Sequence, residues 1–78
     1  MIGGDPLRHV AELAARAEQA YEAMYDSRSP AAHYSDLKDH FAAAIGAAER
    51  AGLRDEVARL RRRLDHCRQV YRRQFAGF

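Results

Sequence analysis

Residues 53–75, LRDEVARLRRRLDHCRQVYRRQF, carry the pattern that decides the fold. Apolar side chains recur there at steps of three or four positions: Leu53, Val57, Leu60, Leu64, Cys67, Tyr71 and Phe75. Because an α-helix has about 3.6 residues per turn, these steps place the apolar side chains on one helical face. The spacing is close to a heptad seam, so we predict a long amphipathic helix over residues 53–75 that packs against other helices.

Two similar apolar stripes come earlier in the chain, each after the same start signal. Asp5-Pro6 and Ser29-Pro30 combine a residue type that caps helix N-termini with proline, which is favoured in the first turn. The first stripe contains Leu7, Val10, Ala14, Ala17, Tyr21 and Met24. The second contains Tyr34, Leu37, Phe41, Ile45 and Ala48. Gly52 follows it and suits the left-handed conformation that often ends a helix. We predict helices over residues 6–26 and 30–51.

The links between the three predicted helices are short. Links of a few residues force neighbouring helices to run antiparallel. We therefore expect a single helical domain over residues 1–78, an all-α, up-down-up three-helix bundle. The alternative is a helical hairpin that becomes stable only as a dimer, because so short a chain buries a small core.

Residues 41–64, with small side chains before Gly52 and an amphipathic stretch after it, resemble one helical hairpin of the tetratricopeptide repeat family. The family's Trp, Tyr and Pro markers are absent, and no second copy follows at the family's repeat period. What the resemblance implies is a shared way of packing two helices around a glycine turn.

Composition narrows the class of protein. The chain has 78 residues, of which 47% are hydrophobic and 31% charged, a balance typical of globular proteins. No apolar run is long enough to span a membrane, and Cys67 is the only cysteine, so no internal disulfide can form. We expect a soluble, cytoplasmic protein. The excess of arginine over lysine is typical of a GC-rich bacterial genome.

Charge is divided unevenly along the chain. Formal charge is −3 over residues 1–26, zero over 27–52 and +5 over 53–78. One interpretation is that the third helix binds nucleic acid or another polyanion through Arg59, Arg61, Arg62, Arg63 and Arg68. The other is a solvated helix surface that pairs with acidic neighbours. We expect pairs of Asp55 with Arg59, of Arg61 with Asp65, and of Glu18 with Arg62, Arg63 or His66. Glu22 should approach Arg68 or Arg72.

Aromatic residues gather at one end of the predicted bundle. Up-down-up topology brings together the end of the first helix, the start of the second and the end of the third. The large side chains could simply close the core there, or part of the cluster could be an exposed interface. Tyrosine and arginine are enriched at protein interfaces. The predicted partner-binding residues are Tyr25, Tyr34, Phe78, Arg28, Arg72 and Arg73.

Motifs for catalysis or metal binding are missing from the sequence. His9, His33, His40 and His66 have no metal-ligand spacing, and we expect His40 to pair with Asp36 instead. There is no glycine-rich phosphate loop and no arrangement of nucleophile and base. We expect no enzyme activity, no cofactor, no metal and no small-molecule substrate. The sequence favours a protein-interaction module that forms a homodimer or docks to a partner protein, with nucleic-acid binding or regulation through the third helix as the alternative.

Overall fold

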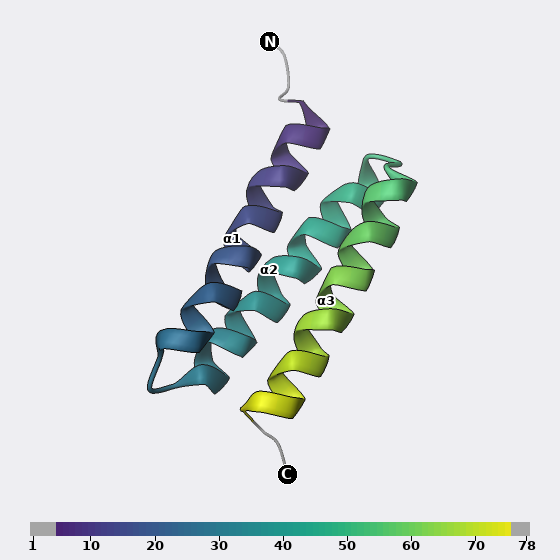
Figure 1. Ribbon diagram of the computed structural model, residues 1–78. Coiled ribbons are helices and arrows are strands. Elements are labelled where there is room, and N and C mark those ends of the chain that lie inside the picture. The colour runs from purple at the N-terminus through teal and green to yellow at the C-terminus, as the bar shows by residue number, and fades with distance from the viewer. Residues whose placement is uncertain (1–4, 76–78) are drawn as a thin grey trace.

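Three α-helices of equal length make up the protein in the computed structural model, which describes residues 5–75 (Figure 1). They are α1 (Pro6–Asp26), α2 (Pro30–Arg50) and α3 (Arg54–Gln74). The described residues contain no strand, and the helices run up, down and up. The predicted all-α three-helix fold is therefore confirmed, with each helix boundary within one residue of its expected position. None of the helices among residues 5–75 combines the length and the apolar character that a membrane span requires.

The starts of α1 and α2 differ although their sequences are alike. The Asp5 carboxylate accepts a hydrogen bond from the backbone N–H of Leu7 at 3.0 Å, so Asp5 caps α1 as predicted. The side chain of Ser29 makes no such bond within the described chain. Instead, Ser27 Oγ accepts a hydrogen bond from the N–H of Ser29 at 2.8 Å, which tightens the link before α2.

Gly52 ends α2 as the sequence predicts. Its φ is 72°, a left-handed conformation that glycine adopts at little cost. The N–H of Gly52 donates to the carbonyl of Glu49 at 3.1 Å, and the N–H of Leu53 donates to that of Ala48 at 2.9 Å. This pair of bonds is a Schellman motif, which satisfies the last carbonyls of α2 and turns the chain into α3.

Alanine side chains bring α1 and α2 into the closest contact in the bundle. The buried residues of these two helices include Ala14 and Ala17 on α1 and Ala44, Ala47 and Ala48 on α2. Small side chains let helix axes approach to the lower part of the usual range of about 8–10 Å. Larger side chains fill the core beside this contact, namely Val10, Met24, Leu37 and Phe41.

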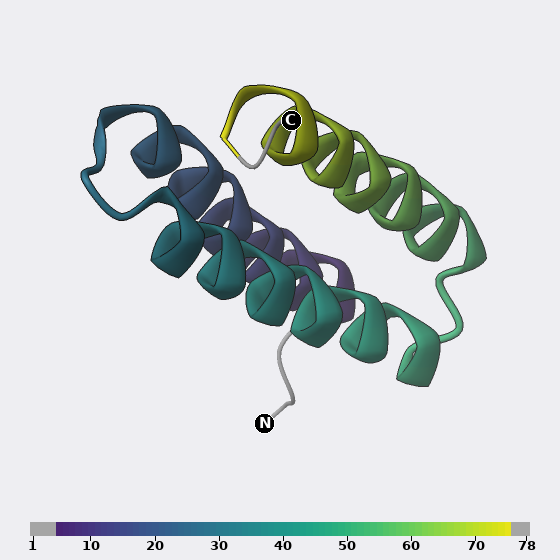
Figure 2. The same ribbon diagram turned by 90° about the horizontal axis from the view of Figure 1, so that it is seen from below.

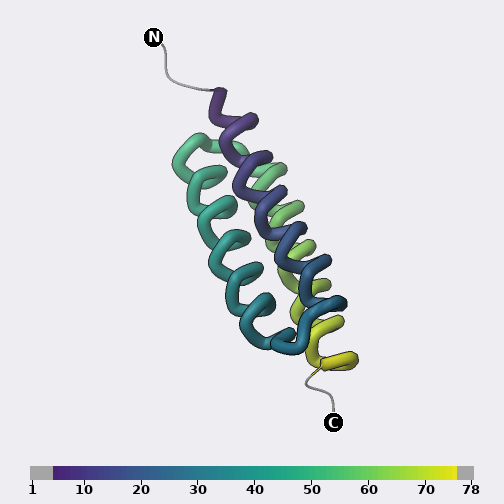
Figure 3. Tube along the Cα trace, turned by 90° about the vertical axis from the view of Figure 1, so that its left-hand side faces the viewer, coloured from purple at the N-terminus to yellow at the C-terminus, as the bar shows by residue number. Residues whose placement is uncertain are grey.

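Helix α3 is less deeply buried in the bundle than α1 and α2 are. Only Leu60 and Cys67 of α3 are fully buried. The rest of its predicted apolar stripe is half-buried against the core: Leu53, Val57, Leu64, Tyr71 and Phe75. α3 packs mainly on α2 and approaches α1 less closely. Figure 2, seen from below, shows α1 and α3 set apart from each other, with α2 along the lower side of the bundle; in Figure 3, α1 faces the viewer, α2 lies to its left and α3 lies behind it.

Two predicted core residues are more exposed than expected. Leu7 is 50% exposed, because α1 and α3 stay apart at this end. A hollow of about 490 Å³ separates Leu7 from residues 52–56. Ile45 is half-buried on the side of α2 that borders α3, where it lines a hollow together with Arg61 and Leu64.

The alanine contact predicts a sharp difference between two neighbouring substitutions. Ala44→Leu places extra methylenes where α1 and α2 meet, since Ala44 is fully buried, and should lower the free energy of unfolding by about 1–3 kcal/mol. Ala43→Leu is the matched control, because Ala43 is exposed on the same helix and Leu is nearly as good a helix former as Ala. Urea denaturation followed by circular dichroism measures both. Equal free energies of unfolding for the two variants would show that the space around Ala44 accommodates a larger side chain.

Candidate interaction surface at the aromatic end

Five aromatic side chains from all three helices meet at one end of the bundle. Tyr21 and Tyr25 come from the last turns of α1, Tyr34 from the start of α2, and Tyr71 and Phe75 from the end of α3. We call this set the aromatic end. Its residues come together because the up-down-up path returns the chain to the same end twice.

The rings of the aromatic end form one continuous row. Tyr21 and Tyr25 pack edge to face with centroids 5.6 Å apart, and Tyr25 meets Phe75 in the same way at 5.5 Å. Phe75 lies 6.0 Å from Tyr71, which stacks on Tyr34 with centroids 3.9 Å apart and planes 2° from parallel. Such pairs contribute about 0.5–1.5 kcal/mol each beyond burial. The row therefore ties α1 to α3 and α3 to α2.

Burial within this row is uneven. Met24 and Leu37 are fully buried and close the core at this end. Tyr21, Tyr34, Tyr71 and Phe75 are half-buried above them, whereas Tyr25 is 47% exposed. Most of the row therefore seals the core and one tyrosine is exposed, while the expected interface stays a prediction.

Cations cover both ends of the row. Lys38 Nζ lies 4.6 Å from the centroid of Tyr34, and the guanidinium carbon of Arg63 lies 4.9 Å from that of Tyr21. A cation over an aromatic face gains about 0.5–1 kcal/mol at exposed sites. Lys38 is not among the residues predicted for this site, although its spacing of four residues from Tyr34 on one helix indicates that the two side chains can meet.

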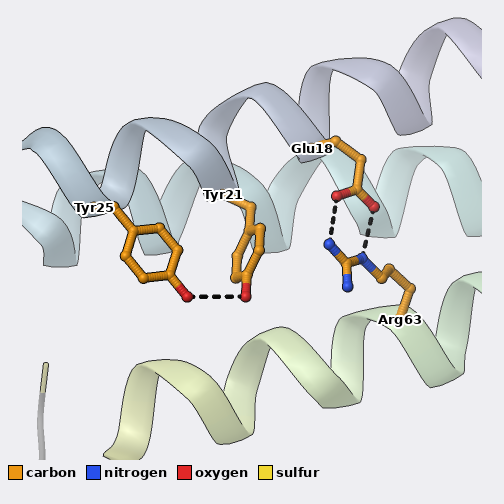
Figure 4. A network of polar contacts seen from close by, with 4 residues as sticks. All are labelled: Glu18, Tyr21, Tyr25 and Arg63. Carbon is orange, nitrogen blue, oxygen red and sulfur yellow. Dashed lines mark hydrogen bonds and ion pairs between the residues drawn. The ribbon is translucent and has the colours of Figure 1, made fainter. Parts of the chain in front are cut away.

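The closest polar link between α1 and α3 is the Glu18–Arg63 pair (Figure 4). The Arg63 guanidinium donates two hydrogen bonds of 2.8 Å, from Nε and Nη2, to the two carboxylate oxygens of Glu18. These bonds raise the pKa of Arg63 further above its ordinary value. The pairing of Glu18 predicted from the helix register is thereby confirmed, with Arg63 as its partner.

Beside this ion pair, Tyr21 and Tyr25 are joined through their hydroxyl groups, whose oxygens lie 3.1 Å apart. Burial, followed by this hydrogen bond, raises the pKa of Tyr21 to about 12. The Tyr21 hydroxyl group therefore stays protonated through the physiological range. In Figure 4 the two phenol groups extend from α1 towards α3 on the same side as Arg63.

The predicted partner-binding arginines lie at this end of the bundle. Arg28 lies in the link between α1 and α2, and Arg72 and Arg73 lie in the last turn of α3. All three are exposed, and none has a carboxylate within 4.0 Å among residues 5–75. Phe78, the remaining residue predicted here, lies outside the described residues.

The five predicted polyanion-binding arginines do not form one free surface. Three of them are paired with carboxylates: Arg59 with Glu56 at 2.6 Å, Arg61 with Glu49 at 2.8 Å, and Arg63 with Glu18. Arg62 and Arg68 are exposed and have no carboxylate within 4.0 Å in the described part of the chain.

Two of the predicted ion pairs had the wrong partner. Arg59 takes Glu56, one turn before it, in place of Asp55, and this bond lowers the pKa of Glu56. Arg61 takes Glu49 from α2 in place of Asp65. The antiparallel register around Gly52 places residue 49 beside residue 61. The spacing of residues within α3 alone does not predict this pair. Among residues 5–75 no ion pair joins Glu22 to Arg68 or Arg72, or Asp36 to His40.

The cysteine and histidines form no reactive cluster in the described chain. Cys67 is fully buried, and burial raises the pKa of its thiol to about 11. A protonated, inaccessible thiol is a poor nucleophile, as expected for a core residue. No group of three or more His, Cys, Asp or Glu side chains within residues 5–75 is arranged to hold a metal ion.

Comparison with models of known protein families, with curated proteins and with solved structures finds no significant match to this chain.

The Glu18–Arg63 pair should stabilise the fold more than the other pair between helices. Both side chains are about a third exposed, at 39% and 34%, and they share two hydrogen bonds, whereas Glu49 and Arg61 are 51% and 62% exposed and share one. We expect Glu18→Gln to lower the free energy of unfolding by about 1–2 kcal/mol and the matched change Glu49→Gln by less than about 0.5 kcal/mol. Urea titrations of the two variants test this difference. A larger loss for Glu49→Gln would contradict it.

Proposed function

We propose that this protein is a small helical interaction module that self-associates or docks to a partner protein through its aromatic end. Support comes from the position of Tyr25. It is one of two large hydrophobic side chains that residues 5–75 leave exposed, at 47%. Tyrosine combines a large apolar ring with a hydroxyl group and is frequent among residues that dominate binding energy.

Tyr25 is also held in place before any partner arrives. Its ring packs against Tyr21 on one side and Phe75 on the other, and its hydroxyl group is bonded to that of Tyr21. A side chain that is already ordered loses little conformational entropy on binding. An exposed and ordered tyrosine is therefore well suited as an anchor for a protein partner.

Charge around the aromatic end supports recognition of an acidic or mixed surface. Arg28, Arg72 and Arg73 lie at the same end of the bundle as Tyr25 and Phe75, are exposed, and have no carboxylate within 4.0 Å in residues 5–75. Charged groups at the rim of an interface mainly set association rate and specificity. Nucleic-acid binding through α3, the alternative function, is less well supported because three of the five arginines predicted to bind a polyanion are engaged in ion pairs.

Tyr25→Ala tests the proposal, with Leu7→Ala as its matched control. Leu7 lies on the same helix, is similarly exposed at 50%, and sits at the opposite end of the bundle. We expect Tyr25→Ala to weaken self-association or partner binding at least about tenfold, in the range found for residues that dominate interfaces, while helicity is retained. Leu7→Ala should have no such effect. Tyr34→Ala is less informative because it also removes the stack on Tyr71.

Two measurements read the outcome. Analytical ultracentrifugation over a range of concentrations gives the self-association constant, and affinity capture from the native source compares species retained by the wild type and by each variant. Loss of dimer, or of one captured species, with Tyr25→Ala alone supports the proposal. A wild-type protein that stays monomeric and retains no species sensitive to Tyr25 would overturn it.

A further inference from the structure

A hollow with a different chemistry lies between α2 and α3, away from the aromatic end. It measures about 480 Å³ and is lined by Ile45, Arg61, Arg62, Leu64, Asp65 and Arg68. Ile45 and Leu64 are half-buried and form its apolar part. The hollow exists because α3 packs on α2 less closely than α1 does.

Positive charge prevails around this hollow. Arg61 is neutralised by Glu49, but Arg62 and Arg68 have no carboxylate within 4.0 Å among the described residues. Asp65 is the one acidic side chain in the lining. The hollow therefore joins two aliphatic side chains to a net cationic rim.

The rim extends along the two helices. Arg61 and Arg68 are seven residues apart, so they lie on one face of α3, about two turns from each other. On α2, Lys38 and Ile45 have the same separation and share the face that borders α3. Basic side chains, of which Arg61 is paired with Glu49, thus accompany the apolar side chains over about 10 Å, the length of two helical turns.

We propose that this hollow binds an acidic amphipathic helix of a partner protein. Apolar side chains of that helix, spaced at three or four residues, would pack on Ile45 and Leu64. Its flanking Asp and Glu residues would meet Arg62 and Arg68. This is the helix-in-groove mode of recognition, with charge complementarity that selects acidic partners. The proposal concerns a surface separate from the aromatic end and does not depend on that site.

A nucleic acid fits the hollow less well, although it would also meet the arginines. Proteins that bind single strands offer aromatic faces on which bases stack. No aromatic side chain lines the hollow. The nearest candidates, Tyr34 and Tyr71, stack on each other at 3.9 Å, and Lys38 also lies over the Tyr34 ring. These two rings are therefore already stacked within the protein itself.

Fluorescence anisotropy with a designed peptide tests this proposal. The probe is a labelled peptide of roughly 14 residues, about four helical turns, with Leu at helical spacing and Glu on both sides of the Leu stripe. A second peptide has the same composition in scrambled order, and a third probe is a short single-stranded DNA. The tested variant is the double substitution Arg62→Glu with Arg68→Glu. Its matched control is Arg8→Glu with Arg16→Glu, which changes the net charge equally on α1.

We expect the amphipathic peptide to bind at physiological ionic strength and the scrambled peptide to bind at least about tenfold more weakly. Arg62→Glu with Arg68→Glu should weaken peptide binding at least about tenfold, while the control keeps the wild-type affinity. Equal binding of the scrambled peptide or of the DNA would overturn the proposal in favour of a general polyanion surface. An absence of peptide binding would overturn it outright. Loss of wild-type self-association in the same variant would assign the hollow to a second copy of the chain instead.

Discussion

The close approach of α1 and α2 over their alanine side chains is the constraint on which the rest of the structure depends. Ala14, Ala17, Ala44 and Ala48 leave little volume between the two helices, so these helices meet more closely than any other pair. The third helix carries larger side chains and cannot lie equally close to both neighbours. It packs mainly on α2 and stays further from α1, and only Leu60 and Cys67 of this helix are fully buried. The bundle is therefore a tight pair of helices with a third, shallower one.

Long side chains bridge the remaining distance between α1 and α3. Arg63 reaches Glu18 with two hydrogen bonds, and Phe75 meets Tyr25 edge to face. A contact made by side-chain tips leaves parts of these side chains accessible to solvent. The spacing that the alanines impose thus explains why Tyr25 is ordered and exposed at once, and why α2 and α3 enclose a cationic hollow. Both proposed binding surfaces follow from the packing of α3.

Local signals in the sequence were sufficient to predict the fold. Proline, the Asp5 cap, Gly52 and the apolar periodicity each act within a few residues, so the helix boundaries and the topology followed from them. Which helices would pack most closely did not follow, because alanine is compatible with a buried or an exposed position. Ile45 and Leu7 were expected in the core because the distances between the helices were not predicted.

The pairing of Glu18 was predictable from the parallel register of α1 and α3, whereas the pairing of Arg61 with Glu49 required the antiparallel register around Gly52. The clustering of the aromatic end was predictable. That Tyr25 would be its one exposed member was not, because this depends on the distances between the helices.

Residue-resolved amide hydrogen exchange under native conditions tests the central claim most directly, since it measures the free energy of local opening at each amide. If α1 and α2 form the tight pair, the amides of Ala17, Ala44 and Ala48 should exchange only at the free energy of global unfolding. Amides in the middle of α3, around Leu64, should exchange at a lower free energy, because this helix can separate while the pair stays intact. A single free energy of exchange shared by all three helices would contradict the account.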